Sequence, residues 1–355
     1  MKSNDFTKSF IAAAALIIIF IVFWEFFWRS KGYAVSYNDD KVIWASTRKK
    51  VYAPSDQATV FIGSSRIKFD IDIPTWKALT GEDAIQLALV GTSPRPVLHN
   101  LARDENFKGK VIMDVQEHAF FSMDSVQREK SARDGIEYFQ KETPAQNVNA
   151  VLDYMLESNF VFLEEGKFGL NALLNGLDIP NRPGIVIRTG PPKDFSFFSR
   201  ERQASMTPMF LENKELQNRV IQYWTKGAAL NKSKPIKGST LEAYFHELKT
   251  SIDKIRSRGG IVVFIRPPSS GTFLERENRD YPRNQYWDLL LKSTQTEGFY
   301  YADYPETAYF VCLEESHLRP ADAIDYTTAL VNILKERVGW TSRGNSNSLA
   351  NPFNR

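Results

Sequence analysis

Short apolar segments alternate with amphipathic stretches along most of the chain after residue 57. Each segment has the length of a buried strand, and most of them stop at a glycine, a proline or a charged residue. The stretches between them place apolar residues three and four positions apart, which is typical of helices. Strands that alternate with helices predict an α/β domain in which a doubly wound parallel sheet forms the middle of three layers. The expected strands cover residues 59–63, 84–90, 110–115, 260–265 and 299–303, and the clearest helices cover 93–106 and 321–338.

Residues 126–258 interrupt this alternation with long helical stretches and a loop rich in proline, glycine and aromatic residues. We interpret them as a helical insertion or cap on a domain of residues 57–340. The insertion either forms a substrate wall or only packs on the domain. The mixed polar residues 29–56 predict a stalk before the domain, and the Asn- and Ser-rich residues 341–355 predict a disordered tail.

A long apolar run lies near the N-terminus. Residues 10–24 contain no polar side chain, and Glu25 separates them from a short aromatic cluster. Together they are about as long as a helix that crosses a bilayer, and aromatic rings favour the headgroup zone. We therefore predict one transmembrane anchor over residues 10–28. A cleaved signal peptide and a buried core helix are the alternatives, but no small-residue cleavage site follows and the run is apolar on every face.

The charges on the two sides of this anchor barely differ. Lys2 and Lys8 precede it, and Arg29 and Lys31 follow it. Because cytoplasmic flanks carry the excess of positive charge, this balance does not decide the orientation.

The composition is that of a globular protein, with 43% hydrophobic and 25% charged residues. The chain has 355 residues, and its 45 basic and 42 acidic residues leave a net charge of only +3. This balance gives no electrostatic basis for binding nucleic acid. The single cysteine, Cys312, excludes an intramolecular disulfide and Cys-rich metal sites. We expect no cofactor and no bound metal.

The first predicted strand ends in Gly63-Ser64-Ser65, where small residues allow the backbone to turn into a helix. A serine hydroxyl at that point projects at the carboxyl edge of the sheet, where reactive groups gather in α/β domains. Free N–H groups at the start of the helix could stabilise an oxyanion there. The alternative is a serine that only caps the helix.

A histidine with a nearby carboxylate precedes the last predicted helix. Glu314 lies three residues before His317. A serine becomes a good nucleophile when an imidazole takes its proton, and a carboxylate at this spacing can hold the ring in the required tautomer. A surface histidine beside acids is the alternative.

These motifs together resemble the SGNH, or GDSL-like, hydrolase superfamily. Its members have a Gly-Asp-Ser block after the first strand, a glycine after the second, a Gly-x-Asn-Asp block after the third, and Asp-x-x-His near the C-terminus. The positions that match here are Gly63-Ser64-Ser65, Gly91, and Glu314 with His317.

The resemblance covers roughly residues 57–340 and leaves the insertion unexplained. It implies an SGNH/flavodoxin-like fold with Ser65 as the nucleophile. It also implies that His317 is the general base, that Glu314 orients this ring, and that Gly91 is an oxyanion donor.

The chain departs from the family in three places. Ser64 replaces the Asp of the first block, and Glu314 replaces the Asp of the last. The third block is missing, and the amide of Gln116 is the candidate replacement for its oxyanion donor. Loss of such a donor lowers a rate roughly 10²–10³-fold, so a slow or inactive enzyme is an open alternative.

An anchored chain with Gly-Ser-Ser is similar to the branch of the superfamily that serves teichoic-acid D-alanine transfer and alginate O-acetylation. This likeness implies a serine acyl esterase or O-acyltransferase that acts on a cell-envelope polysaccharide or a similar acylated polymer. It places residues 1–9 in the cytoplasm and the C-terminal body outside the cytoplasmic membrane. The expected partners are the membrane, the acylated polysaccharide and an acyl-donor membrane protein, without nucleic acid. The alternative is an inactive binding or scaffold protein of polysaccharide biosynthesis or export.

Three further side chains follow predicted strands and are candidate substrate ligands. Arg95 follows the second strand, His118 the third and Arg266 the fourth. Two arginines at one edge could bind a carboxylate, a phosphate or a uronate, or each could pair with a neighbouring acid. A metal-dependent hydrolase built on His118 and His317 is a third hypothesis, which the spacing supports poorly.

Overall fold

The chain forms two compact units. The computed structural model describes residues 3–54, 57–123, 125–175, 191–230 and 234–340. Unit 1 comprises Met1–Asn38 and Pro144–Lys193, and unit 2 comprises Asp39–Thr143 and Asp194–Arg355. The predicted tail, residues 341–355, lies outside the described residues.

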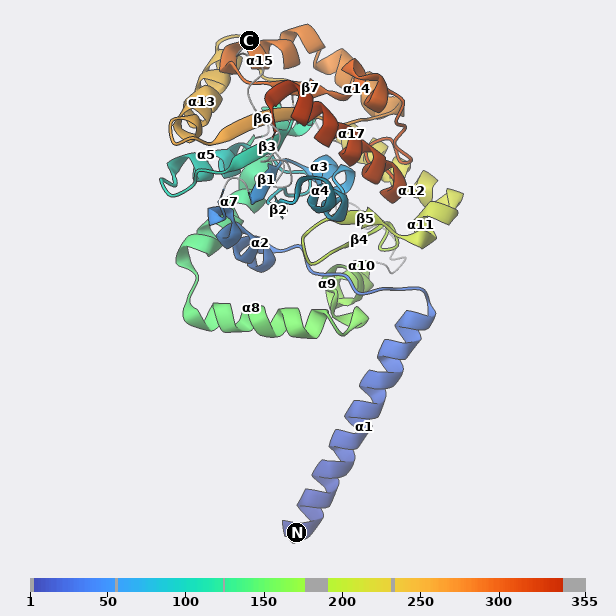
Figure 1. Cartoon of the computed structure of the whole chain (residues 1–355). Coiled ribbons are helices and arrows are strands. Elements are labelled where there is room, and N and C mark those ends of the chain that lie inside the picture. The colour runs from blue at the N-terminus through green and yellow to red at the C-terminus, as the bar shows by residue number, and fades with distance from the viewer. Residues whose placement is uncertain (1–2, 55–56, 124, 176–190, 231–233, 341–355) are drawn as a thin grey trace, which may run out of the picture. The chain divides into compact units, whose positions relative to one another are not determined.

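Unit 2 is built on a five-stranded parallel sheet (Figure 1). In sheet order the strands are β2 (Asp83–Gln86), β1 (Ala58–Ile62), β3 (Lys110–Asp114), β6 (Ile261–Arg266) and β7 (Gly298–Tyr300). Numbered along the chain, this order is 2-1-3-4-5, as in the flavodoxin-like class of doubly wound sheets. All residues of β1 and β3 are buried, which explains why these central strands are continuous apolar runs. The predicted five strands of a parallel sheet are confirmed, although the second is shorter than expected.

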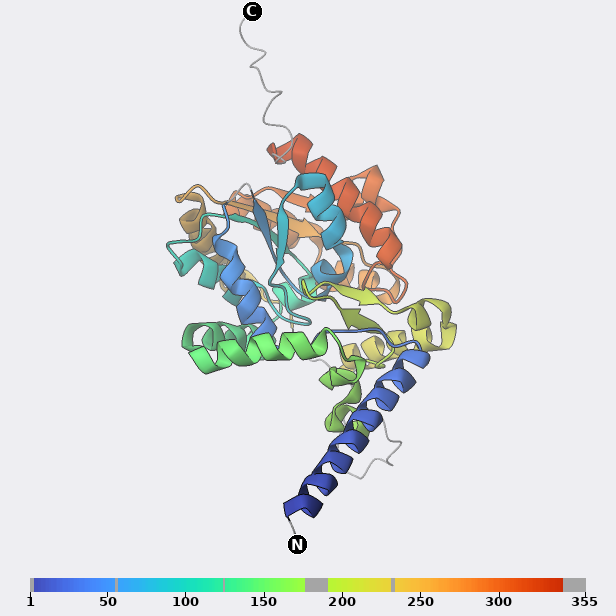
Figure 2. The same ribbon diagram turned by 60° about the horizontal axis from the view of Figure 1, so that its bottom comes forward.

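Helices precede, connect and follow these strands. Those outside residues 144–230 are α2 (Lys41–Arg48), η1 (Lys49–Tyr52), α3 (Ser65–Asp70), α4 (Ile73–Thr80), α5 (Arg95–Arg103), α6 (Glu117–Phe120), α7 (Ser125–Lys141), α13 (Gly238–Arg256), α14 (Gly271–Asp280), η3 (Arg283–Gln285), α15 (Trp287–Thr294), η4 (Tyr301–Asp303), α16 (Pro305–Ala308) and α17 (Pro320–Val338). Helix α17 contacts α3 and α4, whereas α13 contacts α5, α15 and β6. Figures 1 and 2 both show α4 and α17 side by side. The expected arrangement in three layers stays a prediction.

The segment before β1 belongs to unit 2. Helix α2 begins after Asp40, whose carboxylate accepts two backbone N–H groups of the first turn. The Trp44 side chain is fully buried, and its indole N–H donates to the carbonyl of Leu87 at 3.0 Å. The prediction of a stalk over residues 29–56 is therefore wrong for its second half, because the apolar face of a short helix packs on the domain.

The predicted insertion, residues 126–258, is not one structural element. Residues 144–193 belong to unit 1, whereas α7 and α13 belong to unit 2. Helix α13 lies between β3 and β6 in the chain and packs on β6. It is therefore the crossover helix that two neighbouring parallel strands require.

A small antiparallel sheet completes unit 2. Its strands are β4 (Ser196–Phe198) and β5 (Ala204–Met206), followed by α11 (Pro208–Glu212) and α12 (Lys214–Leu230). These elements enclose a second apolar cluster of Phe69, Phe195, Ala204, Met206, Phe210, Leu216 and Val220. Between β4 and β5, the Arg202 guanidinium donates to the carbonyls of Gln86, at 2.5 Å, and Ala88, at 3.1 Å.

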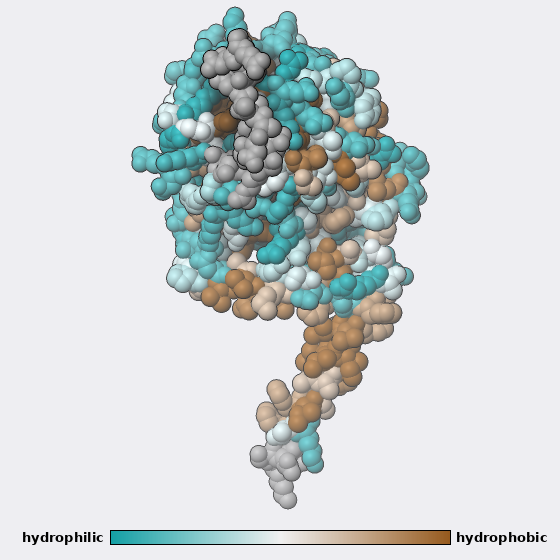
Figure 3. All heavy atoms as spheres, viewed as in Figure 1, coloured by the Kyte–Doolittle hydropathy of each residue, from teal (hydrophilic) through white to brown (hydrophobic). Residues whose placement is uncertain are grey.

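Unit 1 contains the long apolar helix α1 (Ser3–Ser30) together with α8 (Pro144–Glu157), η2 (Val161–Leu163), α9 (Glu165–Phe168) and α10 (Leu170–Asn175). Residues 6–30 of α1 are long and apolar enough to cross a membrane, and none of the most apolar part is buried. Figure 3 shows the hydrophobic side chains that cover this helix. An N-terminal helix that could anchor the chain in a membrane is thus present.

Gly63 tests how tightly the end of β1 packs on β3. A Cβ atom at Gly63 would lie 2.4 Å from Cβ of Asp114 and 2.9 Å from Cγ2 of Ile67, far inside contact distance. We expect Gly63→Ala to lower the free energy of unfolding by about 2 kcal/mol or more, measured by chemical denaturation. Gly227→Ala is the control, because that exposed helical site has open space and gains helix propensity, up to about 1 kcal/mol. Equal stabilities of the two variants would contradict the packing argument.

Candidate functional site

Ser64 and Ser65 follow β1 and differ in their surroundings. Ser64 is buried, and its N–H and hydroxyl both lie 3.1 Å from Oδ2 of Asp114. Its hydroxyl also donates to Oε1 of Gln116 at 2.5 Å. Ser65 is the first residue of α3 and is 8% exposed, and its hydroxyl has no hydrogen-bond partner among the described residues. Of the two serines, only Ser65 therefore has an unengaged hydroxyl.

The carboxyl ends of β1 and β3 lie at the point where the strand order of the sheet reverses. In a sheet of order 2-1-3-4-5, successive connections run in opposite directions from β1 and β3, and ligands bind beyond the carboxyl ends of these strands. Ser65 follows β1, whereas Gln116 and His118 follow β3. The bond between Ser64 and Gln116 joins the two ends directly. Since Oε1 of Gln116 accepts from Ser64, the amide NH₂ group remains available to donate.

Asp114, the last residue of β3, binds Ser64 where the ends of β1 and β3 meet. Burial raises the pKa of its carboxyl, and the nearby Arg66 guanidinium and the donors of Ser64 offset only part of this effect. Its second oxygen, Oδ1, is buried without a partner among the described residues. Because a hydroxyl carries one proton, Ser64 Oγ donates either to Gln116 or to Asp114 at any moment, whereas its N–H always donates to Asp114.

The predicted contact between His317 and Glu314 is present. Nδ1 of His317 lies 2.6 Å from Oε1 of Glu314, and both side chains are almost fully buried. The other carboxylate oxygen, Oε2, accepts the indole N–H of Trp224 on α12 at 2.6 Å. This carboxylate therefore holds the ring proton on Nδ1 and leaves Nε2 as a base. Nε2 is buried and has no partner among the described residues.

Helix α3 connects the histidine to the serine. The imidazole packs on the ring of Phe69, with a centroid distance of 4.3 Å. Phe69 lies four residues after Ser65, so the two share one face of α3. The backbone N–H of Leu318 donates to Asp70 of the same helix at 2.9 Å. Both candidates thus adjoin α3, but the structure contains no hydrogen bond between Ser65 and His317, and their direct contact stays a prediction.

Gly91 and His118 lie near each other through Arg128. The Arg128 guanidinium contacts the carbonyl of Gly91 at 3.4 Å and Nε2 of His118 at 2.7 Å. Gly91 is exposed and has a φ of +64°, which favours glycine. The N–H of Leu89, two residues earlier, donates to the carbonyl of Gly63 at 3.1 Å, so Gly91 belongs to the edge that carries the serines.

His118 is a neutral acceptor in this arrangement. Burial and the Arg128 charge lower its pKa to about 4. Because an arginine only donates, Nε2 of His118 accepts, and the ring proton on Nδ1 faces the Tyr281 hydroxyl at 3.2 Å. These contacts describe a positioned side chain, and they do not test its predicted role as a substrate ligand.

Arg266 is paired with acids inside the protein. It is fully buried and contacts Glu117 at 2.9 Å and Glu277 at 2.7 Å. Arg66 joins the same network through Glu277 at 2.5 Å. Burial alone would lower the pKa of Arg266, but the two carboxylates raise it well above its usual value. Arg266 thus pairs with neighbouring acids, which is the alternative that the sequence left open, and its role as a substrate ligand stays a prediction.

Arg95 is also paired. Its Nε donates to Glu129 at 2.6 Å, a second contact reaches Glu247 at 3.4 Å, and the guanidinium lies over the ring of Tyr244. These partners account for the charge of Arg95 without a ligand, which is the alternative that the sequence left open.

Sequence reasoning missed three residues of this region: Trp224, Arg128 and Asp70. Trp224 lies 90 residues before Glu314, and nothing in its local sequence indicates the contact. Arg128 and Asp70 are ordinary charged residues of helices, and only the fold shows that they bind Gly91 and the residue after His317.

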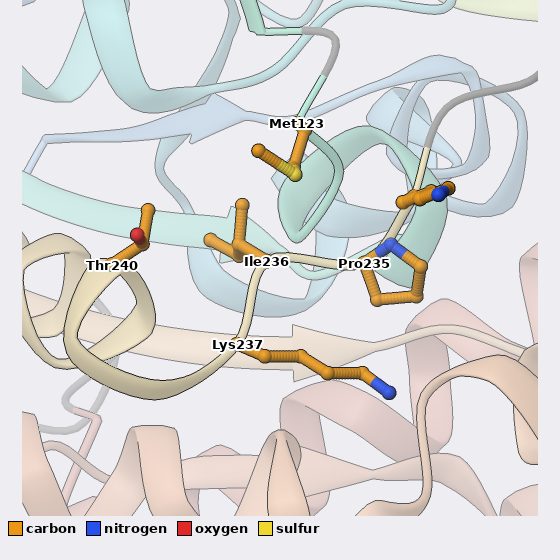
Figure 4. Close-up of a pocket in the computed structure, with 6 residues that line it drawn as sticks. Met123, Pro235, Ile236, Lys237 and Thr240 are labelled. Atoms are coloured by element: carbon orange, nitrogen blue, oxygen red, sulfur yellow. The ribbon is translucent and has the colours of Figure 1, made fainter.

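A pocket of about 360 Å³ lies elsewhere, between the chain after α6 and the start of α13 (Figure 4). Its lining residues are Met123, Lys234, Pro235, Ile236, Lys237 and Thr240. None of them is a candidate catalytic residue. Within the described residues, no group of three or more His, Cys, Asp and Glu side chains is arranged to hold a metal ion.

The sequence matches no protein-family model, and a search of curated proteins finds no match.

The buried ion network predicts a large stability difference. Arg266→Met removes the closest cation of Glu117 and one of the two cations that Glu277 binds, so we expect a loss of about 3–5 kcal/mol in unfolding free energy by chemical denaturation. Arg279→Met is the control, because Arg279 forms an exposed pair with Asp280 that contributes about 1 kcal/mol or less. Similar losses for both variants would mean that the network does not stabilise the fold.

His118 predicts a specific pH dependence. Its folded pKa of about 4 lies below the unfolded value of about 6.5. It therefore contributes stability above pH 6.5, which is lost as the pH falls towards 4. In a ¹⁵N-detected titration, with His118→Gln used for assignment, we expect this ring to stay neutral down to about pH 4. A midpoint near 6.5 would show that the ring is not buried against Arg128.

Proposed function

We propose that this protein is a membrane-anchored serine acyl esterase or O-acyltransferase of SGNH type that acts on a cell-envelope polysaccharide or a similar acylated polymer. In this proposal α1 crosses the cytoplasmic membrane with its N-terminus inside. Unit 2 then lies on the outer side and has the three-layer arrangement of the superfamily. The acyl group comes from the acylated polymer itself or from an acyl-donor membrane protein. In the second case the polymer is the acceptor.

One observation carries the proposal. His317 has its Nδ1 held by Glu314 at 2.6 Å and its Nε2 buried without a partner among the described residues. A buried polar nitrogen without a partner is costly in a structure that only has to fold. A general base that takes a proton from a hydroxyl explains this arrangement. The candidate hydroxyl is that of Ser65, which has no hydrogen-bond partner among the described residues and lies on the same face of α3 as Phe69.

The reaction assigns one task to each residue. Ser65 Oγ attacks the acyl carbonyl carbon while His317 Nε2 takes the hydroxyl proton. The N–H groups of Ser65 and Gly91 and the amide of Gln116 stabilise the resulting oxyanion. His317 then returns the proton to the leaving alcohol, which leaves an acyl-Ser65 ester. Water as the next acceptor gives hydrolysis, and a sugar hydroxyl gives transfer.

The proposal requires the His317 ring and the Ser65 hydroxyl to come within hydrogen-bond distance, and no such bond joins them in this structure. The imidazole packs on Phe69, which lies four residues, or about 6 Å, along α3 from Ser65. In the reactive state it approaches Ser65, guided by Glu314 and Trp224. Binding of the polymer supplies the energy for this step in our proposal.

A specific observation favours a second function, that of an inactive polysaccharide-binding or scaffold protein. The His317 side chain is only 2% exposed and is enclosed by the rings of Phe69, Phe195 and Trp224. Such an aromatic shell also suits a histidine that only stabilises the fold. The two functions differ in whether the protein turns over an ester.

Ester hydrolysis by the full-length protein in detergent separates them. We expect wild-type protein to hydrolyse p-nitrophenyl acetate. Ser65→Ala and His317→Gln should each lower kcat/KM by about 10³-fold, because each removes a member of the catalytic unit. Glu314→Gln should lower it less, since the ring keeps a hydrogen-bonding partner.

Ser257→Ala, at an exposed serine of unit 2, is the matched control and should retain the wild-type rate. Equal rates for wild type and Ser65→Ala would remove Ser65 from the mechanism. No turnover by the wild type, together with a shift in Tm on addition of an acetylated polysaccharide, would establish the binding function instead.

A further inference from the structure

The apolar side of helix α8 is exposed. Its apolar residues recur at positions i, i+3, i+4, i+7 and i+8, which places them on one face. Each side chain of this face is at least half exposed: Val148, Val151, Leu152, Met155 and Leu156. No residue of α8 is buried. A surface helix of a globular domain has the opposite orientation, with its apolar face in the core.

The polar side of α8 holds the helix in this orientation. Tyr154 stacks on Tyr37, with a centroid distance of 5.9 Å and an angle of 11° between the rings. The Asn38 amide donates to Glu157 at 2.5 Å. Both contacts lie opposite the apolar face, so the exposure of that face is a consequence of specific packing.

The segment that follows α8 is joined to the end of α1. The Glu25 carboxylate accepts the backbone N–H of Val161 at 2.9 and 3.1 Å, and Arg29 donates to the carbonyl of Asn159 at 3.2 Å. The Trp28 ring packs on Phe168 at 4.6 Å. The C-terminal turns of α1 and the helices after α8 therefore form one body within unit 1.

The length of α1 indicates how deep in a bilayer the contacts between the end of α1 and the segment after α8 lie. Residues 6–24 of α1 are apolar apart from Thr7, Lys8 and Ser9 at their N-terminal end, and they span about 28 Å as a helix, close to the thickness of the hydrocarbon layer. If they fill that layer, Glu25, Trp28 and Arg29 lie at the headgroup level. The segment bound to them lies at the same level.

We propose that the apolar face of α8 inserts into the interface of the same bilayer that α1 crosses. The helix lies in the membrane plane, and Val151, Leu152 and Met155 reach the boundary between headgroups and acyl chains. The inference rests on the anchor in our proposed function. Figure 3 shows the hydrophobic residues along α1.

The charge of α8 specifies the kind of lipid surface. The helix carries Asp153 and Glu157 and no lysine or arginine. Apolar burial, rather than attraction to anionic lipids, therefore provides the contact. A zwitterionic bilayer is sufficient, and added anionic lipid should not strengthen the insertion.

Fluorescence quenching by spin-labelled lipids measures how deeply a residue of α8 enters the bilayer. Full-length Leu152→Cys carries an environment-sensitive fluorophore in phosphatidylcholine vesicles with spin-labelled lipids. Asn147→Cys, on the polar flank of α8, is the control. Cys312 stays in place, because it is buried and burial raises the pKa of its thiol, so it labels poorly. We expect quenching at residue 152 to exceed that at residue 147 roughly threefold, with or without phosphatidylglycerol.

Ile18→Cys on α1 separates this inference from the anchor. Strong quenching at residue 18 with equal, weak quenching at residues 152 and 147 would overturn the inference and leave the anchor intact. Disulfide-linked dimers of Leu152→Cys would overturn it in favour of a second copy of the chain. No quenching at residue 18 would reject the anchor and the inference together. Met155→Cys repeats the measurement on the same face.

Discussion

A buried network of two arginines and two glutamates connects the elements at the carboxyl edge of the sheet. Arg66 comes from α3, Glu117 from α6, Arg266 from the end of β6, and Glu277 from α14. Burial raises the pKa of the Glu277 carboxyl, but the Arg66 and Arg266 guanidinium groups together lower it by more than burial raises it. Glu277 therefore keeps its negative charge. Removal of one member leaves buried charges unpaired, which makes the network cooperative. It therefore fixes the backbone beside the candidate residues.

This position matters because the candidates are its immediate neighbours in the chain. Ser65 precedes Arg66, and Gln116 precedes Glu117. The same side chains that resist movement of the strand ends thus hold the serine and the amide in register across β1 and β3. The histidine is held differently, by Glu314, Trp224 and an aromatic shell of the smaller cluster. The candidate nucleophile thus lies on a rigid edge of the sheet, whereas the candidate base is supported separately.

The sequence predicted local features well and long-range ones poorly. The strands were predictable because parallel strands buried on both faces are continuous apolar runs, and the pair Glu314–His317 because three residues suffice to join them. The stalk was misjudged because α2 has only a few apolar residues, among them Trp44. The pairing of Arg266 was not predictable in detail, because its partner Glu117 lies 149 residues away. Whether Ser65 meets His317 depends on side-chain positions that no local pattern encodes.

Arg202 has a consequence for the behaviour of the protein in a crowded compartment. Strand β2 is an edge of the central sheet, and the carbonyls of Gln86 and Ala88, at its end and just beyond, face outward. Unpaired acceptors of this kind invite a strand of another molecule, which is a common start of aggregation. A guanidinium that occupies both acceptors closes this edge to such pairing, and the left-handed backbone of Arg202, with a φ of +68°, is the local strain that accompanies this protection.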